Sequence, residues 1–126
     1  MSCLLDTHAL LWFLADDARL SERAKATICS EERAGVSCVS LWEIVLKKNL
    51  GKLRVESTAE EITALCGAKD IEVIGISPRA LDRLADLPFI HRDPFDGLIV
   101  ATALEEGMTI VTRDSIIPRY DVPTLW

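Results

Sequence analysis

Five acidic residues of this chain stand beside predicted strand ends or helix starts, where carboxylates could hold a metal ion. They are Asp6, Glu43, Asp93, Asp96 and Asp114. Carboxylates that are brought together repel one another and raise each other's pKa, and a divalent cation relieves that conflict. Oxygen ligands without a thiolate or imidazole at metal spacing suit Mg²⁺ or Mn²⁺ rather than Zn²⁺. A metal of this kind can activate a water for attack on a phosphodiester.

Asp96 is the acid that an ordinary structural role explains least. Asp93 is the expected N-cap of a helix whose first residue is Pro94. Asp96 then falls in the first turn, where the helix dipole favours an acid, but it shares the apolar face of Ile99 and Ala103. A buried carboxylate without a partner is costly, and Arg92 is the only nearby cation in the sequence. We therefore expect a metal ion to be the partner of Asp96.

The other acids also have ordinary explanations. Asp6 could cap the helix that follows it, and Asp114 could be a turn residue. Glu43 precedes Lys47 by four residues, the favoured orientation of an exposed helix pair worth roughly 0.2–0.5 kcal/mol. Each explanation stays open for its residue alone. Together they require several independent caps and turns to gather at one end of a sheet.

Basic residues near the acids could contact a nucleic-acid backbone. The candidates for substrate binding are Lys47, Lys48, Arg92 and Arg113, and Lys52 and Arg54 extend the patch after Glu43. The alternative is a solvated helix end, where the dipole favours cations. Two histidines could act as general bases, although structural roles are favoured for both, and no motif supports a Ser/His/Asp triad. They are His8 and His91. The chain also has three tryptophans, Trp12, Trp42 and Trp126, which are more typical of a core or an interface than of base stacking.

Predicted strands and helices alternate along the chain. Strands are predicted over 3–5, 35–39, 71–76, 109–111 and 123–126, and helices over 7–14, 22–33, 40–48, 58–68, 78–87 and 93–106. No hairpin signal joins two strands, which indicates an α/β fold with a mostly parallel sheet and helices on both faces. Ligands in such folds bind beyond the carboxyl ends of the strands, near a topological switch point. Most of the acids fall at that edge.

The whole chain has the length of one domain, spanning residues 1–126. Hydrophobic residues make up 49% of it, so either the strands are buried on both faces or some apolar surface meets a partner, and the apolar helix 7–14 is the candidate surface. No membrane span or signal peptide is indicated, and the cysteine spacing favours buried reduced thiols at Cys3 and Cys38 in a cytoplasmic protein. The net charge of −6 disfavours broad nucleic-acid binding but leaves room for a nuclease whose acidic site takes up metal.

Four segments, 4–12, 40–44, 91–96 and 111–114, resemble the PIN-domain ribonucleases in their order and residues, and more narrowly the VapC-type toxins of toxin–antitoxin pairs. The resemblance implies a PIN-like three-layer sandwich around a central, mostly parallel sheet of four to five strands. It also implies a Mg²⁺- or Mn²⁺-dependent endoribonuclease. The catalytic, metal-binding acids would be Asp6, Glu43, Asp96 and Asp114, with Asp93 as an auxiliary acid.

The same resemblance implies partners. They are an RNA substrate, a second copy of the chain in a homodimer, and a cognate antitoxin whose C-terminal segment lies over the site and often inserts a basic side chain. Gly97 stands where this subgroup often has Arg, a departure that concerns substrate binding more than the metal site.

The leading hypothesis is a metal-dependent endoribonuclease toxin that hydrolyses RNA by in-line attack of a metal-activated water. The alternative is a catalytically silent module with the same fold that acts through an antitoxin-like partner. A haloacid-dehalogenase-like phosphatase is disfavoured because it requires a second Asp two residues after the first, where this chain has His8. A receiver-type domain is disfavoured because no Lys follows a late strand.

Overall fold

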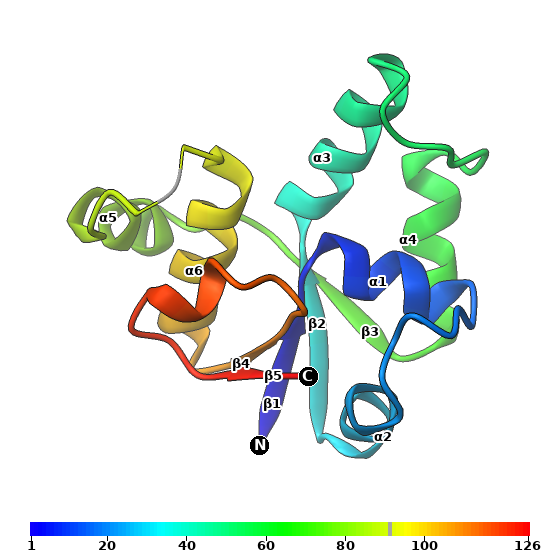
Figure 1. The fold of residues 1–126 in the computed structure, drawn as a ribbon, viewed down its shortest axis with the longest axis horizontal. Coiled ribbons are helices and arrows are strands. Elements are labelled where there is room, and N and C mark those ends of the chain that lie inside the picture. Colours follow the sequence, from blue (N-terminus) through cyan, green and yellow to red (C-terminus); the bar gives the residue numbers. More distant parts are fainter. Residues whose placement is uncertain (91) are drawn as a thin grey trace.

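The computed structural model describes residues 1–90 and 92–126, and a five-stranded sheet runs through its centre (Figure 1). The strands are β1 (Ser2–Leu5), β2 (Arg33–Ser37), β3 (Ile71–Ile74), β4 (Thr109–Val111) and β5 (Thr124–Leu125). Their order is β3-β2-β1-β4-β5, and each neighbouring pair is parallel. The predicted parallel sheet is therefore confirmed. The connection after β1 leads to β2 and the connection after β4 leads to β5, in opposite directions along the sheet, which places a topological switch point between the ends of β1 and β4.

Helices cover both faces of this sheet. They are α1 (Thr7–Leu14), α2 (Glu22–Ser30), α3 (Cys38–Asn49), α4 (Ala59–Ala68), α5 (Pro78–Asp86), α6 (Pro94–Glu106) and the short 3₁₀ helix η1 (Ile117–Arg119). Figure 1 shows α5 and α6 on one side of the sheet and α1, α2 and α4 on the other. The fold is thus the predicted three-layer sandwich. Within the described part of the chain, no helix is long and apolar enough to cross a membrane.

Alternation along β1 supplies both layers of the core. Leu4 packs with Ile99, Val100 and Ile110 under α6, whereas Leu5 packs in the cluster under α1 and α4. Successive side chains of a strand point to opposite faces, so one short strand serves two cores. This double burial explains why Cys3, Leu4 and Leu5 of β1 are all apolar rather than alternating with polar residues.

Side-chain caps set most helix starts where the sequence predicts them. Asp6, Ser21, Ser77 and Asp93 each accept a hydrogen bond from a backbone N–H in the first turn of the helix that follows. At α4, Thr58 rather than Ser57 is the cap and forms a reciprocal capping box.

The second strand and the third helix begin earlier than the sequence pattern predicts. The hydroxyl of Ser37, not that of Ser40, accepts the hydrogen bond from a first-turn N–H, which comes from Val39. Cys38 therefore starts α3 and is only half-buried, so its predicted place in a strand is wrong. Cys3 lies in β1 as predicted, where burial raises the pKa of its thiol to about 11. All four cysteines are free thiols.

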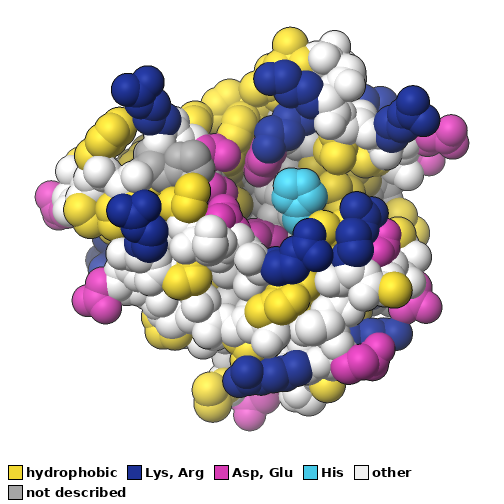
Figure 2. Space-filling view, viewed as in Figure 1, with side chains coloured by type: hydrophobic (Ala, Val, Ile, Leu, Met, Phe, Trp, Pro, Cys, Tyr) yellow, Lys and Arg dark blue, Asp and Glu magenta, His cyan; other side chains and the backbone are white. Residues whose placement is uncertain are grey.

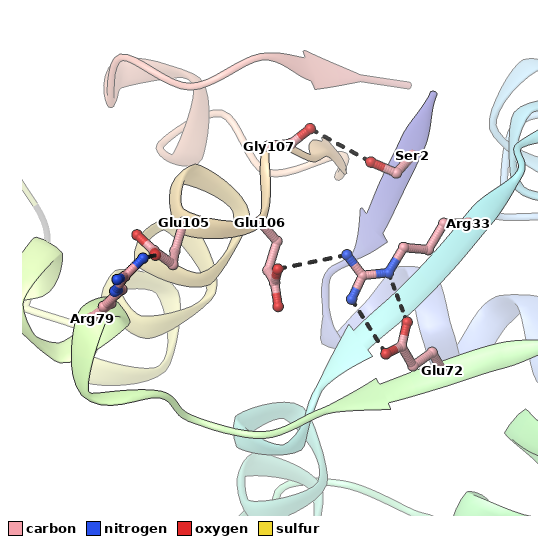
Figure 3. A network of polar contacts seen from close by, with 7 residues as sticks. All are labelled: Ser2, Arg33, Glu72, Arg79, Glu105, Glu106 and Gly107. Atoms are coloured by element: carbon pink, nitrogen blue, oxygen red, sulfur yellow. Dashed lines mark hydrogen bonds and ion pairs between the residues drawn. The ribbon is translucent and has the colours of Figure 1, made fainter.

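Charged residues at the end of the sheet where the strands begin are tied to one another (Figure 3). Arg33 of β2 donates to both carboxylate oxygens of Glu72 in β3, at 2.7 and 3.2 Å, and contacts Glu106 at the end of α6 at 3.6 Å. Across the same end, the hydroxyl of Ser2 donates to the carbonyl of Gly107 at 3.5 Å. Glu72 and Glu106 at this end of the sheet are thus both partners of Arg33.

Candidate active site

An acidic cleft of about 460 Å³ opens at the switch point, beyond the ends of β1 and β4. Its lining residues are Asp6, Thr7, His8, Trp12, Arg19, Glu43, Lys47, Asp93, Asp96, Arg113 and Asp114. The structure therefore brings all five predicted acids into one cavity. Figure 2 shows Asp and Glu side chains gathered on one side of a hollow in this face, with Lys and Arg side chains across from them.

Asp6 is both a helix cap and a wall of the cleft. Its Oδ1 accepts the backbone N–H of Ala9 at 2.9 Å, and its Oδ2 accepts the hydroxyl of Thr112 at 2.5 Å. Burial raises the pKa of Asp6, and these two hydrogen bonds oppose that rise. The capping explanation for Asp6 is thus correct, and it coexists with a place in the site because the cap lies at the end of β1.

Asp114 is held in place by the turn that follows β4. Its backbone N–H donates to Oγ1 of Thr112 at 3.0 Å, and its Oδ1 accepts the N–H of Ile116 at 2.8 Å. Thr112 therefore accepts from Asp114 and donates to Asp6. This threonine links the segments after β1 and β4, and sets the positions of two acids at once.

Glu43 projects from the middle of α3 and is almost fully buried, with 4% of its surface exposed. Its Oε1 lies 2.5 Å from the hydroxyl of Thr7, which in turn lies 2.9 Å from the hydroxyl of Ser40. An ionised carboxylate only accepts, so Thr7 donates to Glu43. The ammonium group of Lys47, one turn further along α3, contacts Oε2. The predicted Glu43–Lys47 pair exists, but Glu43 lies inside the cleft rather than on an exposed helix face.

Asp93 and Asp96 stand at the start of α6. Asp93 caps the helix, with its Oδ1 accepting the N–H groups of Phe95 at 2.8 Å and Asp96 at 3.4 Å. Burial raises the pKa of Asp96 to about 7, and Asp93, Asp114, Glu43 and Asp6 each add to the rise. The four other acids thus act electrostatically on Asp96, as their gathering in one cleft requires.

The predicted basic residues divide into two groups. Lys47 and Arg113 line the cleft, whereas Lys48 and Arg92 are not among its lining residues. Lys48 instead donates to the carbonyls of Glu56 and Ser57, both at 3.4 Å, and so ties α3 to the loop before α4. Lys52 and Arg54 are exposed beyond α3. His8 lies on the exposed rim of the cleft, and His91 lies outside the described residues.

Four polar or aromatic residues that line the cleft or contact its acids were not predicted from the sequence as site residues. They are Thr7, Trp12, Arg19 and Thr112. The two threonines carry a usable signal, since each lies within two residues of a strand end and within two residues of an acid. Arg19 has no such signal, because its approach to the cleft depends on the fold of the segment after α1.

Gly97 lies buried in the first turns of α6, against α5. A Cβ at this position would stand 3.0 Å from Cδ1 of Leu84. A larger side chain here must displace Leu84. Glycine at this position, where the subgroup often has Arg, therefore allows α5 to pack closely on α6.

The donors of the cleft suit a hard divalent cation. Five carboxylates line the cleft and can supply oxygen ligands. Burial raises the pKa of Asp96, and the negative charge of the four other acids adds to that rise. Among the residues described, no group of three or more His, Cys, Asp or Glu is already arranged to hold a metal ion. Asp6 and Glu43 direct their oxygens at Thr112, Thr7 and Lys47 instead. A carboxylate oxygen can accept a hydrogen bond and still ligate a cation, so the bonds from the two threonines can persist. Binding of a cation at Oε2 of Glu43 would instead compete with the ammonium group of Lys47.

Comparison with known proteins gives the family. A family model described as PIN domain matches residues 3–123. Ribonuclease VapC22 of Mycobacterium tuberculosis is 29% identical over 131 residues, which cover 98% of this chain and 97% of that protein. The crystal structure of VapBC2 from Rickettsia felis, bound to a DNA fragment from its promoter, matches with a TM-score of 0.72 at 16% identity, covering 99% of this chain and 98% of that one. FitAcB from Neisseria gonorrhoeae matches with a TM-score of 0.66 at 20% identity, covering 98% and 96%. The fold, the acidic cleft at its switch point and the match along almost the whole chain agree: this protein is a member of the PIN domain family.

Proposed function

We propose that the protein is a Mg²⁺- or Mn²⁺-dependent endoribonuclease and the toxin of a toxin–antitoxin pair. The observation that carries the proposal is the gathering of five carboxylates in one cleft, where burial and then the four other acids raise the pKa of Asp96 to about 7. The name of the relative Ribonuclease VapC22 supports RNA as the substrate. The toxin–antitoxin complexes among the structural relatives support the fold on which such a toxin is built.

The residues proposed to hold the metal are Asp6, Glu43, Asp96 and Asp114, with Asp93 as an auxiliary acid. When bound, the cation would offset the negative charge of the phosphate and activate a water for attack. The chain's own contribution is positioning. Thr112 orients Asp6, Thr7 orients Glu43, and the cap formed by Asp93 fixes the start of the helix that carries Asp96.

Cleavage of RNA by the purified chain, free of any partner protein, tests the proposal. We expect cleavage with Mg²⁺ or Mn²⁺, none with EDTA, and a loss of at least about a hundredfold in Asp6→Asn and Asp96→Asn. Glu72→Gln is the matched control, because this acid lies at the opposite end of the sheet with Arg33. If Asp6→Asn and Asp96→Asn cleave as well as the parent, the assignment is wrong.

A catalytically silent module is the second candidate, and one observation favours it. No group of three or more potential ligands in the described chain stands ready around one point. Calorimetry separates the two candidates. Binding of Mn²⁺ that is lost in Asp96→Asn supports the nuclease, whereas no divalent-ion binding together with tight binding of a partner protein supports the silent module.

We propose that an antitoxin covers a second cleft beside the first. This cleft, of about 470 Å³, is lined by residues of α1, of the loop before α4 and of α4, including Leu11, Leu14, Val55 and Ile62. It shares Trp12 with the acidic cleft, so one bound segment could reach both. The apolar helix predicted as a partner surface is α1, and its surplus side chains Leu11 and Leu14 are half-buried along this cleft. A cytoplasmic location is part of the same proposal.

A homodimer is proposed through the outer face of α3. Trp42, Val45, Leu46 and Leu50 are all exposed there, at helical spacing, and Trp42 packs edge-on against Phe95 with ring centroids 4.8 Å apart. Contiguous exposed apolar side chains of this kind mark interaction surfaces. Sedimentation of the parent and of Leu46→Arg tests it: the parent is expected to be a dimer and the variant a monomer, and a dimeric variant would contradict this surface.

A further inference from the structure

Two arginines lie over the ring of one tryptophan at the edge of the acidic cleft. The guanidinium carbon of Arg113 is 4.6 Å from the centroid of the Trp12 ring, and that of Arg19 is 5.1 Å from it. All three residues line the cleft. We propose that Arg19 and Arg113, held on Trp12, form a subsite for a backbone phosphate of the RNA beside the acids. The identity of the ligand rests on the proposed ribonuclease function.

Trp12 is a fixed platform. It is 8% exposed, packed in the core cluster below α1, and its ring meets that of Trp126 edge-on with centroids 5.8 Å apart. The ring of His8 lies against it as well, at 5.5 Å. A cation within about 6 Å of an indole centroid is attracted by the negative face of the ring. The predicted core role of Trp12 is thus confirmed, and the two guanidinium groups also lie over its ring.

Arg19 is oriented from the side by Asp17. Its Nη2 donates to Oδ2 of Asp17 at 2.7 Å and its Nε to Oδ1 at 3.1 Å, while the backbone N–H of Arg19 also donates to Oδ1. The Nη1 group takes no part in these bonds. A guanidinium fixed along one edge presents its remaining donors in a set direction, which suits the oxygens of a phosphate.

Arg113, unlike Arg19, is not held by an ion pair with a carboxylate of the described residues. It precedes Asp114 directly and follows Thr112, so its backbone position is set by the turn that positions the acids. Within the described part of the chain, Arg113 forms no ion pair with a carboxylate. Its donors are therefore not committed to an acid of the protein, and an incoming phosphate can take them.

The charge distribution of the cleft favours a phosphate on this side. RNA is a polyanion, and the acidic wall repels it unless cations offset the charge. The third cation of the cleft, Lys47, is engaged with Glu43. Two guanidinium groups near one ring also repel each other, and an anion that contacts both removes that repulsion. An acidic segment of a partner protein could offer the same charge, but RNA is favoured because the subsite is continuous with the acids.

Binding of a fluorescein-labelled single-stranded RNA in EDTA tests the subsite without catalysis. We expect Arg19→Gln and Arg113→Gln each to weaken binding roughly threefold to tenfold, and to lower the slope of log affinity against log salt by about 0.7. Arg23→Gln is the matched control, since this exposed arginine of α2 does not line the cleft. Unchanged affinity and slope in both cleft variants would overturn the proposal, as would loss of partner-protein binding with RNA binding intact.

Cleavage kinetics separate this proposal from the one on which it rests. With Mg²⁺ or Mn²⁺, the two variants are expected to raise KM with kcat within about twofold, because the subsite binds the substrate away from the reacting bond. If the parent cleaves RNA and both variants match its KM, the subsite is wrong and the ribonuclease stands. If the parent never cleaves RNA but the salt slopes change as expected, the subsite stands and the ribonuclease is wrong.

Discussion

Lys47 and Glu43 form an ion pair inside the acidic cleft, one turn apart on α3, with Lys47 a third exposed and Glu43 buried. Burial would lower the pKa of Lys47, but the hydrogen bond and the charge of Glu43 raise it, with Asp93 and Asp96 adding to the rise. The ammonium group is therefore an internal counter-ion for the acids. It contacts a carboxylate oxygen that we propose as a metal ligand, so ammonium and metal should compete for it.

Replacing Lys47 by Met tests this competition. In EDTA the variant is expected to be less stable than the parent by about 2 kcal/mol, because Glu43 is left buried with Thr7 as its remaining side-chain donor. This loss is smaller than that for a fully buried ion pair because Lys47 is partly exposed. Saturating Mn²⁺ should restore more stability to the variant than to the parent. Urea unfolding with and without Mn²⁺ measures both effects.

Lys25→Met is the control for that experiment. Lys25 pairs with Asp16 at 2.8 Å on the surface, far from any proposed ligand in sequence. Exposed pairs contribute about 0–1 kcal/mol, so this variant should unfold nearly as the parent does, with the same response to Mn²⁺. An equal response to Mn²⁺ in Lys47→Met and the parent would show that the ammonium group and the metal do not share a site.

The raised pKa of Asp96 predicts how the stability of the metal-free protein depends on pH. An unfolded Asp titrates near 3.9, whereas burial and the neighbouring acids raise the pKa of folded Asp96 to about 7. Between these values the folded state keeps a proton that the unfolded state has lost, so the free energy of unfolding falls as the pH rises. The slope from this one group is at most about 1.4 kcal/mol per pH unit. Asp6, whose pKa is also raised, acts in the same direction.

Urea unfolding in EDTA across pH 5 to 8, a range of about three units around the raised pKa, measures that slope. Asp96→Asn carries no titratable group at this position and should show a flatter dependence than the parent. Parallel curves for the parent and for Asp96→Asn would mean that the fall in stability comes from other groups.

Thr112 is predicted to be a positioning residue for two acids. Thr112→Val keeps the shape but removes the donor to Asp6 and the acceptor for the N–H of Asp114. We expect a loss of stability of about 1–3 kcal/mol from the polar groups left unsatisfied. The affinity for Mn²⁺ should fall about 10- to 100-fold, as is usual when a group that orients a ligand is lost.

Thr112→Ser is the matched variant, because it restores the hydroxyl and removes the methyl group. Calorimetric titration of Mn²⁺ should show that Thr112→Ser binds with an affinity near that of the parent and that Thr112→Val binds weakly. If Thr112→Val binds Mn²⁺ as tightly as Thr112→Ser does, the hydroxyl of Thr112 has no part in placing the acids.

The acids of the site were predictable from the sequence because local rules and the topology agree on them. Asp6 and Asp93 are caps, and caps have strong residue preferences at fixed positions. A chain of alternating strands and helices then places strand-end residues at one edge of the sheet. The same reasoning placed the start of α3 too late, since Ser37 and Ser40 are equally good caps by type and only packing decides between them.

The rest of the site depends on contacts between distant segments, which spacing does not reveal. The bond between Thr112 and Asp6 joins residues 106 positions apart, and that between Thr7 and Glu43 joins residues 36 apart. Arg19 reaches the cleft only because Asp17 and Trp12 hold it there. Tertiary packing sets these contacts, so they became visible only in the structure.

We predict that β2 requires a glycine at position 35 because β3 lies too close for a side chain there. A Cβ at this position would stand 2.8 Å from Cδ1 of Ile74 and 3.2 Å from the carbonyl oxygen of Glu72, and the backbone cannot yield as a side-chain end can. Gly35→Ala should therefore lower the free energy of unfolding by about 1–3 kcal/mol, the usual cost of overpacking. Gly67→Ala in α4 is the matched control: among the described residues, nothing beyond its own stretch of helix lies within 4 Å of the added Cβ, so it should gain about 0.5–1 kcal/mol from helix propensity. Urea unfolding of both variants decides the matter, and a Gly35→Ala protein as stable as the parent would show that β2 and β3 can move apart without cost.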